Sequence, residues 1–113
     1  MERIQLYQVD AFTDKLFHGN PAAVCILQNW LNDELMQAIA LENNLSETAF
    51  VVKNEHGYHI RWFSPNGEID LCGHATLAAA FVIFQQDETI SQLVFASLSG
   101  PLSVKKEERF IEL

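Results

Sequence analysis

The segment from residue 75 to residue 86, which reads ATLAAAFVIFQQ, constrains the fold more than any other part of the chain. It carries no charged side chain, and as a helix it would present no polar face over about three turns. A helix that is apolar on all sides has to be buried on all sides. Its four alanines would let strands approach closely. The segment therefore predicts a central helix with a strongly curved sheet wrapped around it.

Most of the remaining segments are typical of strands. Apolar or alternating runs predict strands over residues 4–12, 22–27, 48–53, 58–63, 68–72, 92–98 and 102–113. Turn signals at 54–57 (NEHG) and 64–67 (SPNG) join neighbouring strands, and the charged run at 105–108 (KKEE) predicts a hairpin tip or a solvated edge. Residues 33–44 predict a second helix, with Asn32 as its N-cap. This order predicts an α+β fold, with a curved, mostly antiparallel, barrel-like sheet around the central apolar helix.

Length and charge limit the number of domains and the class of partner. With 113 residues the chain has room for one domain, residues 1–113. Seven basic and fifteen acidic residues give a net charge of −8. This charge argues against nucleic acid and anionic membrane surfaces as main partners, because both are polyanions. The longest apolar stretch, residues 75–84, is about half of the roughly twenty residues that a membrane-spanning helix needs.

The N-terminus and the cysteines bear on the location of the protein. The first residues show no basic region followed by an apolar one, so no secretory signal is expected. Cys25 and Cys72 lie far apart and form no CxxC pair, which favours a reducing, cytoplasmic location. No metal site is expected, because His18, His56 and His59 have no partner at metal-ligand spacing.

Gly73 and His74 lie directly between a predicted strand and the apolar helix. A glycine allows tight approach of the backbone, and the first N–H groups of a helix lack internal partners. Residues 72–76 (CGHAT) therefore predict an anion-binding turn for a carboxylate or a phosphate. The alternative is structural: Gly73 only turns the chain, and His74 only caps the helix.

Glu47 is a second candidate, at the start of a strand whose two faces are both apolar. Partial desolvation at such a position favours general acid–base chemistry by a carboxylate. The alternatives are a solvated glutamate at a helix–strand junction and a cap for a nearby loop. Cys72 could act as a thiolate base, since a helix N-terminus lowers the pKa of a thiol, or could be a small core residue. Asp10 and Asn20 bracket the first loop and either line a cleft or only form turns.

Five motifs follow one another along the chain: VDAFT at 9–13, GNPAAV at 19–24, NLSETAF at 44–50, RWFSP at 61–65 and EIDLCGHAT at 68–76. Their order and spacing resemble the N-terminal half of the phenazine-biosynthesis isomerase-like (PhzF-type) family over nearly the whole chain. The resemblance implies a fold similar to diaminopimelate epimerase. In that fold each of two pseudo-symmetric halves wraps a barrel-like sheet around a central apolar helix, and the active site lies in the cleft between the halves.

The resemblance also implies roles for individual residues. The family's acid–base glutamate maps onto Glu47, and its Gly-His pair, which contacts the substrate carboxylate, maps onto the start of the apolar helix. The predicted substrate-binding residues are Asn20, Ser46, Gly73, His74 and Ala75. The family member that acts in phenazine biosynthesis moves a proton without a metal or an organic cofactor. Epimerase relatives use cysteines in a related Cys-Gly turn, a role that the presence of Glu47 makes unnecessary for Cys72.

Two functions from different classes follow from these observations. The first is an isomerase or epimerase-type half-enzyme that acts on a small carboxylate-bearing metabolite, with Glu47 as general acid and base. The alternative is a non-catalytic remnant or binding subunit that needs a partner chain to complete the cleft, because the family's second half is absent. An apolar cleft face favours self-association, so a homodimer, or pairing with a separate second half, is expected.

Overall fold

The computed structural model describes residues 4–11, 20–43, 47–106 and 111–112. Its elements, in chain order, are β1 (Gln5–Ala11), β2 (Asn20–Leu27), α1 (Asp33–Asn43), β3 (Glu47–Asn54), β4 (Gly57–Ser64), β5 (Gly67–Ile69), α2 (Gly73–Gln86), β6 (Gln92–Ala96), β7 (Leu102–Lys106) and β8 (Ile111–Glu112). Within these ranges, neither helix combines the length and the apolar character that crossing a membrane requires.

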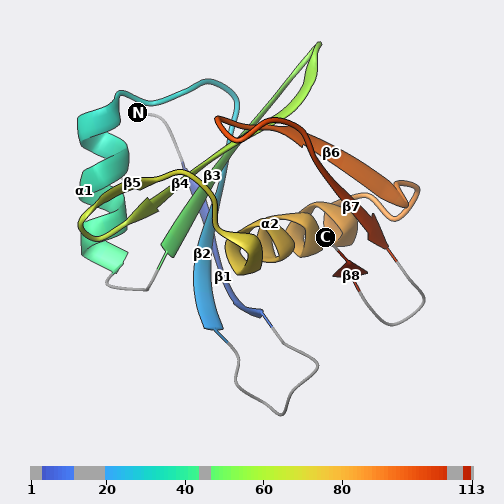
Figure 1. Cartoon of the computed structure of the whole chain (residues 1–113), viewed down its shortest axis with the longest axis horizontal. Helices are drawn as coiled ribbons and strands as arrows, with labels where there is room; N and C mark the ends of the chain where they lie inside the picture. Colours follow the sequence, from blue (N-terminus) through green and yellow to red (C-terminus); the bar gives the residue numbers. More distant parts are fainter. Residues whose placement is uncertain (1–3, 12–19, 44–46, 107–110, 113) are drawn as a thin grey trace.

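The strands form one sheet in the order β1-β2-β3-β4-β6-β7-β8, with β5 paired to β4 beside this path. Five of the seven described strand pairs are antiparallel, and the pairs β2–β3 and β4–β6 are parallel. The sheet bends around α2, which contacts β1, β2, β3, β7 and β8 (Figure 1). The predicted α+β fold, with a curved and mostly antiparallel sheet around a central helix, is confirmed.

Helix α2 fills the concave side of the sheet, as its apolar sequence predicts. Its alanines at 75, 78, 79 and 80 are buried, and they share one core cluster with Val24, Val51, Trp62 and Phe95 from the strands. The helix begins at Gly73, two residues before the predicted start. The reason is local: Cys72 has an extended backbone, and its carbonyl accepts the N–H of Thr76 at 3.0 Å, which closes the first helical turn.

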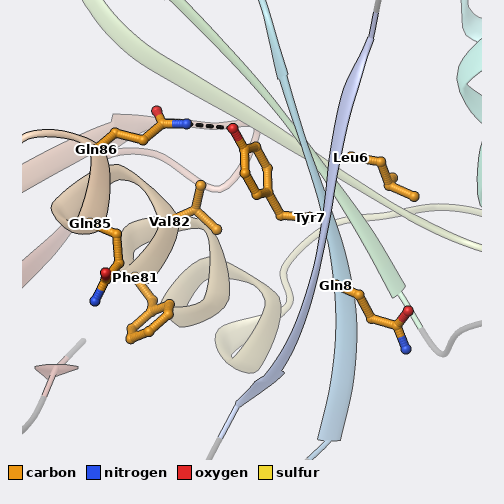
Figure 2. A pocket seen from close by; sticks show the side chains of 7 residues that line it. All are labelled: Leu6, Tyr7, Gln8, Phe81, Val82, Gln85 and Gln86. Carbon is orange, nitrogen blue, oxygen red and sulfur yellow. Dashed lines mark hydrogen bonds between the residues drawn. The ribbon is translucent and has the colours of Figure 1, made fainter.

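The expectation that α2 is buried on all sides is wrong for one stripe. Phe81 is 43% exposed, and Gln85, one turn further on, is exposed as well. In the described part of the sheet β1 and β8 are not paired with each other, so the sheet leaves one side of the helix open. A hollow of about 430 Å³ lies on this side between β1 and α2, and Gln86 donates a hydrogen bond to the Tyr7 hydroxyl across it (Figure 2).

Helix α1 lies on the opposite, convex face of the sheet (Figure 1). Met36 on the helix joins Phe50 and Phe63 of the sheet in a second core cluster, where the two rings meet edge to face at 5.4 Å. The predicted N-cap is confirmed, because the side-chain oxygen of Asn32 accepts the N–H of Leu35 at 2.7 Å. Strand β3 is therefore buried between two helices, and its buried residues point to both faces.

Arg61 joins α1 to β4 and β5. Its guanidinium donates to both carboxylate oxygens of Glu68, at 2.7 and 2.8 Å, and to Asp33 at 3.1 Å. The hydrogen bond that Arg61 donates to Glu68 is the main reason why the pKa of Arg61 lies above its ordinary value. Arg61 also lies over the ring of Trp30, at 5.5 Å from its centroid. These contacts give the arginine a structural role.

Both predicted tight turns are present. At the β3–β4 turn the side chain of Asn54 accepts the N–H of His56 at 2.8 Å, and Gly57 has φ +112°, a conformation that side chains disfavour. At the β4–β5 turn Ser64 Oγ accepts the N–H of Asn66 at 3.1 Å. The two lysines of the charged run at 105–108 are exposed residues of β7, which pairs antiparallel with β8, and the two glutamates lie outside the described residues.

Cys25 makes the free energy of unfolding depend on pH in the alkaline range. Its side chain is fully buried, and burial raises the pKa of the thiol from 9.0 to about 12. The unfolded chain therefore releases this proton first, so the stabilisation is complete below about pH 9 and is lost as the pH rises towards 12. We expect this one group to lower the free energy of unfolding by up to about 1.4 kcal/mol per pH unit in that window.

Urea denaturation of the wild type and of Cys25→Ala at several pH values from 8 upwards measures this contribution. The variant should start less stable and show a shallower loss of stability with pH, since other titrating groups are shared by both proteins. Equal slopes for the two proteins would contradict the assignment.

Candidate functional site

The site is built where the first residue of β3 meets the first turn of α2. Glu47 begins β3, and His74 is the second residue of α2. His74 Nε2 lies 2.9 Å from Glu47 Oε2, within hydrogen-bond distance. The side chains of Glu47 and His74 are 19% and 24% exposed, so both groups are partly accessible to solvent. A carboxylate and an imidazole in this contact can hold and transfer a proton.

The backbone at the start of α2 adds the electrostatics of a helix N-terminus. Gly73 is the first helical residue, so its N–H and those of His74 and Ala75 have no acceptor within the helix. The partial positive charge of the helix dipole is concentrated at this end. His74 therefore stands beside groups that favour an anion, which is the property that the CGHAT motif predicts.

A chain of buried hydrogen bonds holds this turn in place. The Trp62 indole N–H donates to the Thr76 hydroxyl at 3.0 Å, and the Thr76 hydroxyl donates to the carbonyl of Cys72 at 2.7 Å. Thr76 is completely buried and Trp62 is 1% exposed. The start of α2 is thus fixed to strand β4, which limits how far the Gly73–His74 backbone can move.

Cys72 is the N-cap of α2, and its thiol faces the His74 ring. Its Sγ lies 3.5 Å from Nδ1 and 3.9 Å from Nε2 of His74. Burial raises the pKa of the Cys72 thiol, and this effect outweighs the lowering by nearby backbone N–H groups. The negative charge of Glu47 adds to the rise. The direction is opposite to the one expected for a thiolate base at a helix N-terminus.

The His74 ring contacts both neighbours at once. With the proton on Nε2, the ring donates to Glu47, while the Cys72 sulfur lies against the ring, 3.5 Å from Nδ1 and 3.9 Å from Nε2. His74 then fixes the direction of the Glu47 carboxylate and is itself oriented by the cysteine.

The structure brings some of the predicted site residues together and does not describe others. Glu47, Gly73 and His74 share the site, and Ala75 follows in the first turn of α2, where it is fully buried. Asn20 begins β2, and the parallel register of Ala22 with Glu47 places the beginnings of β2 and β3 at the same edge of the sheet. The side chains of Asp10 and Asn20, and the whole of His18 and Ser46, lie outside what the structure describes.

The sequence did not reveal the grouping of Glu47, Cys72 and His74. One potential ligand atom from each residue lies within 4.8 Å of the others, so the three side chains face one small volume. His56, in contrast, sits at the β3–β4 turn, at the far end of β3 from Glu47. In the sequence the three residues lie in two separate motifs, NLSETAF and CGHAT, and only the fold brings these motifs together.

The hollow between β1 and α2 is a separate feature. Its lining residues on α2 are Phe81, Val82, Gln85 and Gln86, in the second half of the helix, whereas His74 is in the first turn (Figure 2). The hollow therefore lies along the open side of the helix and does not include the Glu47–His74 contact.

Comparison with known proteins identifies the family of this chain. A family model described as phenazine biosynthesis-like protein (PhzC-PhzF) matches residues 9–112. The chain belongs to this family. Among curated relatives, it is 58% identical over 105 residues to an uncharacterised isomerase of Pseudomonas aeruginosa, covering 92% of this chain and 40% of the relative. It is 47% identical over 120 residues to a phenazine biosynthesis-like domain-containing protein of Bos taurus, covering 98% of this chain and 42% of the relative.

Solved structures of the PhzF family have the same fold. A family member from Enterococcus faecalis matches with a TM-score of 0.88 and 55% identity, over 96% of this chain and 42% of its own. A predicted epimerase from Pseudomonas aeruginosa matches with a TM-score of 0.78 at 22% identity, over 97% of this chain and 41% of its own, which supports the fold alone. The chain thus spans about 40% of the length of these relatives, and it belongs to a family whose members include named isomerases.

Proposed function

We propose that this chain supplies the proton-transfer half of a cofactor-independent isomerase or epimerase that acts on a small carboxylate-bearing metabolite. The observation that carries the proposal is the 2.9 Å contact between Glu47 Oε2 and His74 Nε2 at the N-terminus of α2. It supports the proposal because a carboxylate, an imidazole that can orient it and the N–H groups at a helix start lie in one partly solvated corner.

In the proposed reaction the substrate carboxylate accepts hydrogen bonds from the N–H groups at the start of α2. The Glu47 carboxylate takes a proton from a substrate carbon and returns it to a different carbon in an isomerisation. In an epimerisation it takes the proton from one face, and an acid on the other wall of the cleft gives a proton to the opposite face. Negative charge that develops on the substrate is stabilised by the positive end of the helix dipole. Transfer by a positioned carboxylate contributes about 10²–10⁴-fold to the rate of such a step.

His74 acts as a positioning residue in this scheme. Its hydrogen bond holds one carboxylate oxygen of Glu47 and leaves the other free to face a substrate. Both side chains are less than one-quarter exposed, so few water molecules lie near Glu47 when it transfers the substrate proton. Cys72 is not needed as a base, since burial keeps its thiol protonated near neutral pH.

The second wall of the cleft is the less constrained part of the proposal. Relatives are more than twice as long as this chain, and a second copy could take the place of the rest of their length. Phe81, which is 43% exposed, supports self-association through the open side of α2. We therefore propose a homodimer, which light scattering over a dilution series would detect as a doubled mass.

The free, buried cysteines support a cytoplasmic location.

Solvent exchange tests the proposed activity. The protein is incubated in D₂O with a panel of small carboxylates, and deuterium on carbon is measured by mass spectrometry. Incorporation above the rate of a heat-denatured control is the expected result. The alternative of a binding subunit without catalysis predicts that a carboxylate binds while no carbon-bound deuterium appears.

A further inference from the structure

Glu47, Cys72 and His74 present three different metal-ligand atoms to one small volume. A carboxylate oxygen, a thiol sulfur and an imidazole nitrogen lie within 4.8 Å of one another, and they come from β3 and from the start of α2. Cys72 and His74 are two positions apart, and Glu47 lies 25 and 27 positions before them, so only the fold joins Glu47 to this pair.

The donor atoms can be compared with those of a tetrahedral zinc site. Zinc binds sulfur at about 2.3 Å and nitrogen or oxygen at about 2.0–2.2 Å, so neighbouring ligand atoms of a tetrahedral site lie about 3.3–3.6 Å apart. Here His74 Nε2 lies 2.9 Å from Glu47 Oε2, whereas Cys72 Sγ lies over the ring, 3.5 Å from Nδ1 and 3.9 Å from Nε2. Metal binding therefore requires a rotation of the Cys72 side chain that brings the sulfur to the side of Nε2 that faces Glu47.

Ligand chemistry and charge favour the same class of cation. One thiolate, one imidazole and one carboxylate suit a borderline-soft divalent ion, whereas Mg²⁺ and Ca²⁺ prefer oxygen ligands alone. The chain as a whole carries a net charge of −8, which attracts cations. The partial exposure of Glu47 and His74 leaves one side of the cluster open to a water molecule as fourth ligand.

We propose that Glu47, Cys72 and His74 bind Zn²⁺ or a similar thiol-binding divalent cation, and that the bound ion blocks proton transfer by Glu47. On binding, the cysteine thiol releases its proton to solvent and the ring proton of His74 moves from Nε2 to Nδ1, so that the sulfur, His74 Nε2 and a Glu47 oxygen each donate an electron pair to the ion. The hydrogen bond between Glu47 and His74 is replaced by two metal bonds. The inhibitory part rests on the proposed function, and the binding part does not.

Binding is tested with Co²⁺ as a spectroscopic probe added to the purified, metal-free chain. We expect a thiolate-to-cobalt charge-transfer band together with the visible bands of four-coordinate Co²⁺, and Zn²⁺ should remove both by displacement. Cys72→Ser should lose the charge-transfer band and bind at least tenfold more weakly, while Cys25→Ala, which removes the other thiol, should keep the band. His74→Gln should lose affinity, and His56→Gln, at the exposed turn, should not.

Several outcomes would overturn the site. They are the absence of a charge-transfer band in the wild type, a band that survives in Cys72→Ser, and a band that disappears in Cys25→Ala. Glu47→Gln serves as a further variant in case Cys72→Ser fails to fold, and it should also weaken binding at least tenfold.

If exchange activity is present, Zn²⁺ should abolish it and a chelator should restore it. Exchange activity that persists when the site is filled with Zn²⁺ overturns the claim that the bound ion inhibits. If the protein shows no exchange activity at all, the result counts against the proposed function. The cobalt experiment then still decides whether the metal site exists.

Discussion

Replacing Glu47 by Gln should lower the rate of solvent deuterium incorporation into a substrate by about 10²–10⁴-fold. Gln has the same shape, and its amide oxygen can still accept the hydrogen bond from His74 that now reaches Glu47 at 2.9 Å. The amide cannot take a proton from carbon, so the variant removes the base while it keeps the contact. The measurement is the exchange rate at saturating substrate.

The matched control for this variant is Glu42→Gln on α1. Glu42 is exposed on the convex side of the sheet, so the same change of charge there should leave the exchange rate unchanged. Thermal unfolding of both variants shows whether the fold is intact. An undiminished exchange rate in folded Glu47→Gln would remove this residue from the mechanism.

Trp62→Ala should have the largest effect on stability among single substitutions near the site. Trp62 is 1% exposed and lies in the core cluster that packs around α2. Truncating a buried aromatic side chain to alanine costs about 3–5 kcal/mol, against a total stability of about 5–15 kcal/mol for a typical domain. The variant should therefore show a much lower urea midpoint, or no cooperative unfolding at all.

Trp62→Phe separates packing from hydrogen bonding. It keeps an aromatic ring in the core but removes the indole N–H that donates to Thr76 at 3.0 Å. The Thr76 hydroxyl still donates to the carbonyl of Cys72, so no buried donor is orphaned, and the expected cost of about 1–2 kcal/mol lies well below that of the alanine variant. Trp30→Phe, at a site that is 39% exposed, is the control and should change stability by less than about 0.5 kcal/mol. Equal losses in Trp62→Phe and Trp30→Phe would show that the buried network does not hold the turn.

Local patterns in the sequence were sufficient to predict the elements of this fold. The uncharged segment at 75–86 could be stable only in a core, and the structure places α2 inside the sheet. The cap at Asn32 and the turn at Gly57 depend on chemistry within a few residues, so they could be read directly. The open side of α2 was missed, because whether β1 and β8 meet depends on the curvature of the whole sheet. Phe81 is exposed for that reason.

The site was predicted residue by residue but not as a unit. Glu47 and His74 were each singled out by their motifs, yet their contact depends on the parallel pairing of β2 and β3 and on the position of α2 within the sheet. The network from Trp62 through Thr76 is likewise long-range. Hydrophobic patterning specifies which residues are buried, whereas polar contacts between distant segments depend on the final backbone geometry.

The central claim is that a carboxylate binds at the start of α2 beside Glu47, and a two-dimensional ¹H–¹⁵N NMR titration with benzoate tests it most directly. Benzamide, which has the same ring without the charge, is the matched control ligand. We predict that benzoate shifts the amide signals of Gly73, His74 and Ala75 most strongly and that benzamide does not. Benzoate shifts centred instead on Tyr7 and Gln86 at the open side of α2, equal shifts with benzamide, or no shift at the start of α2 would contradict the account.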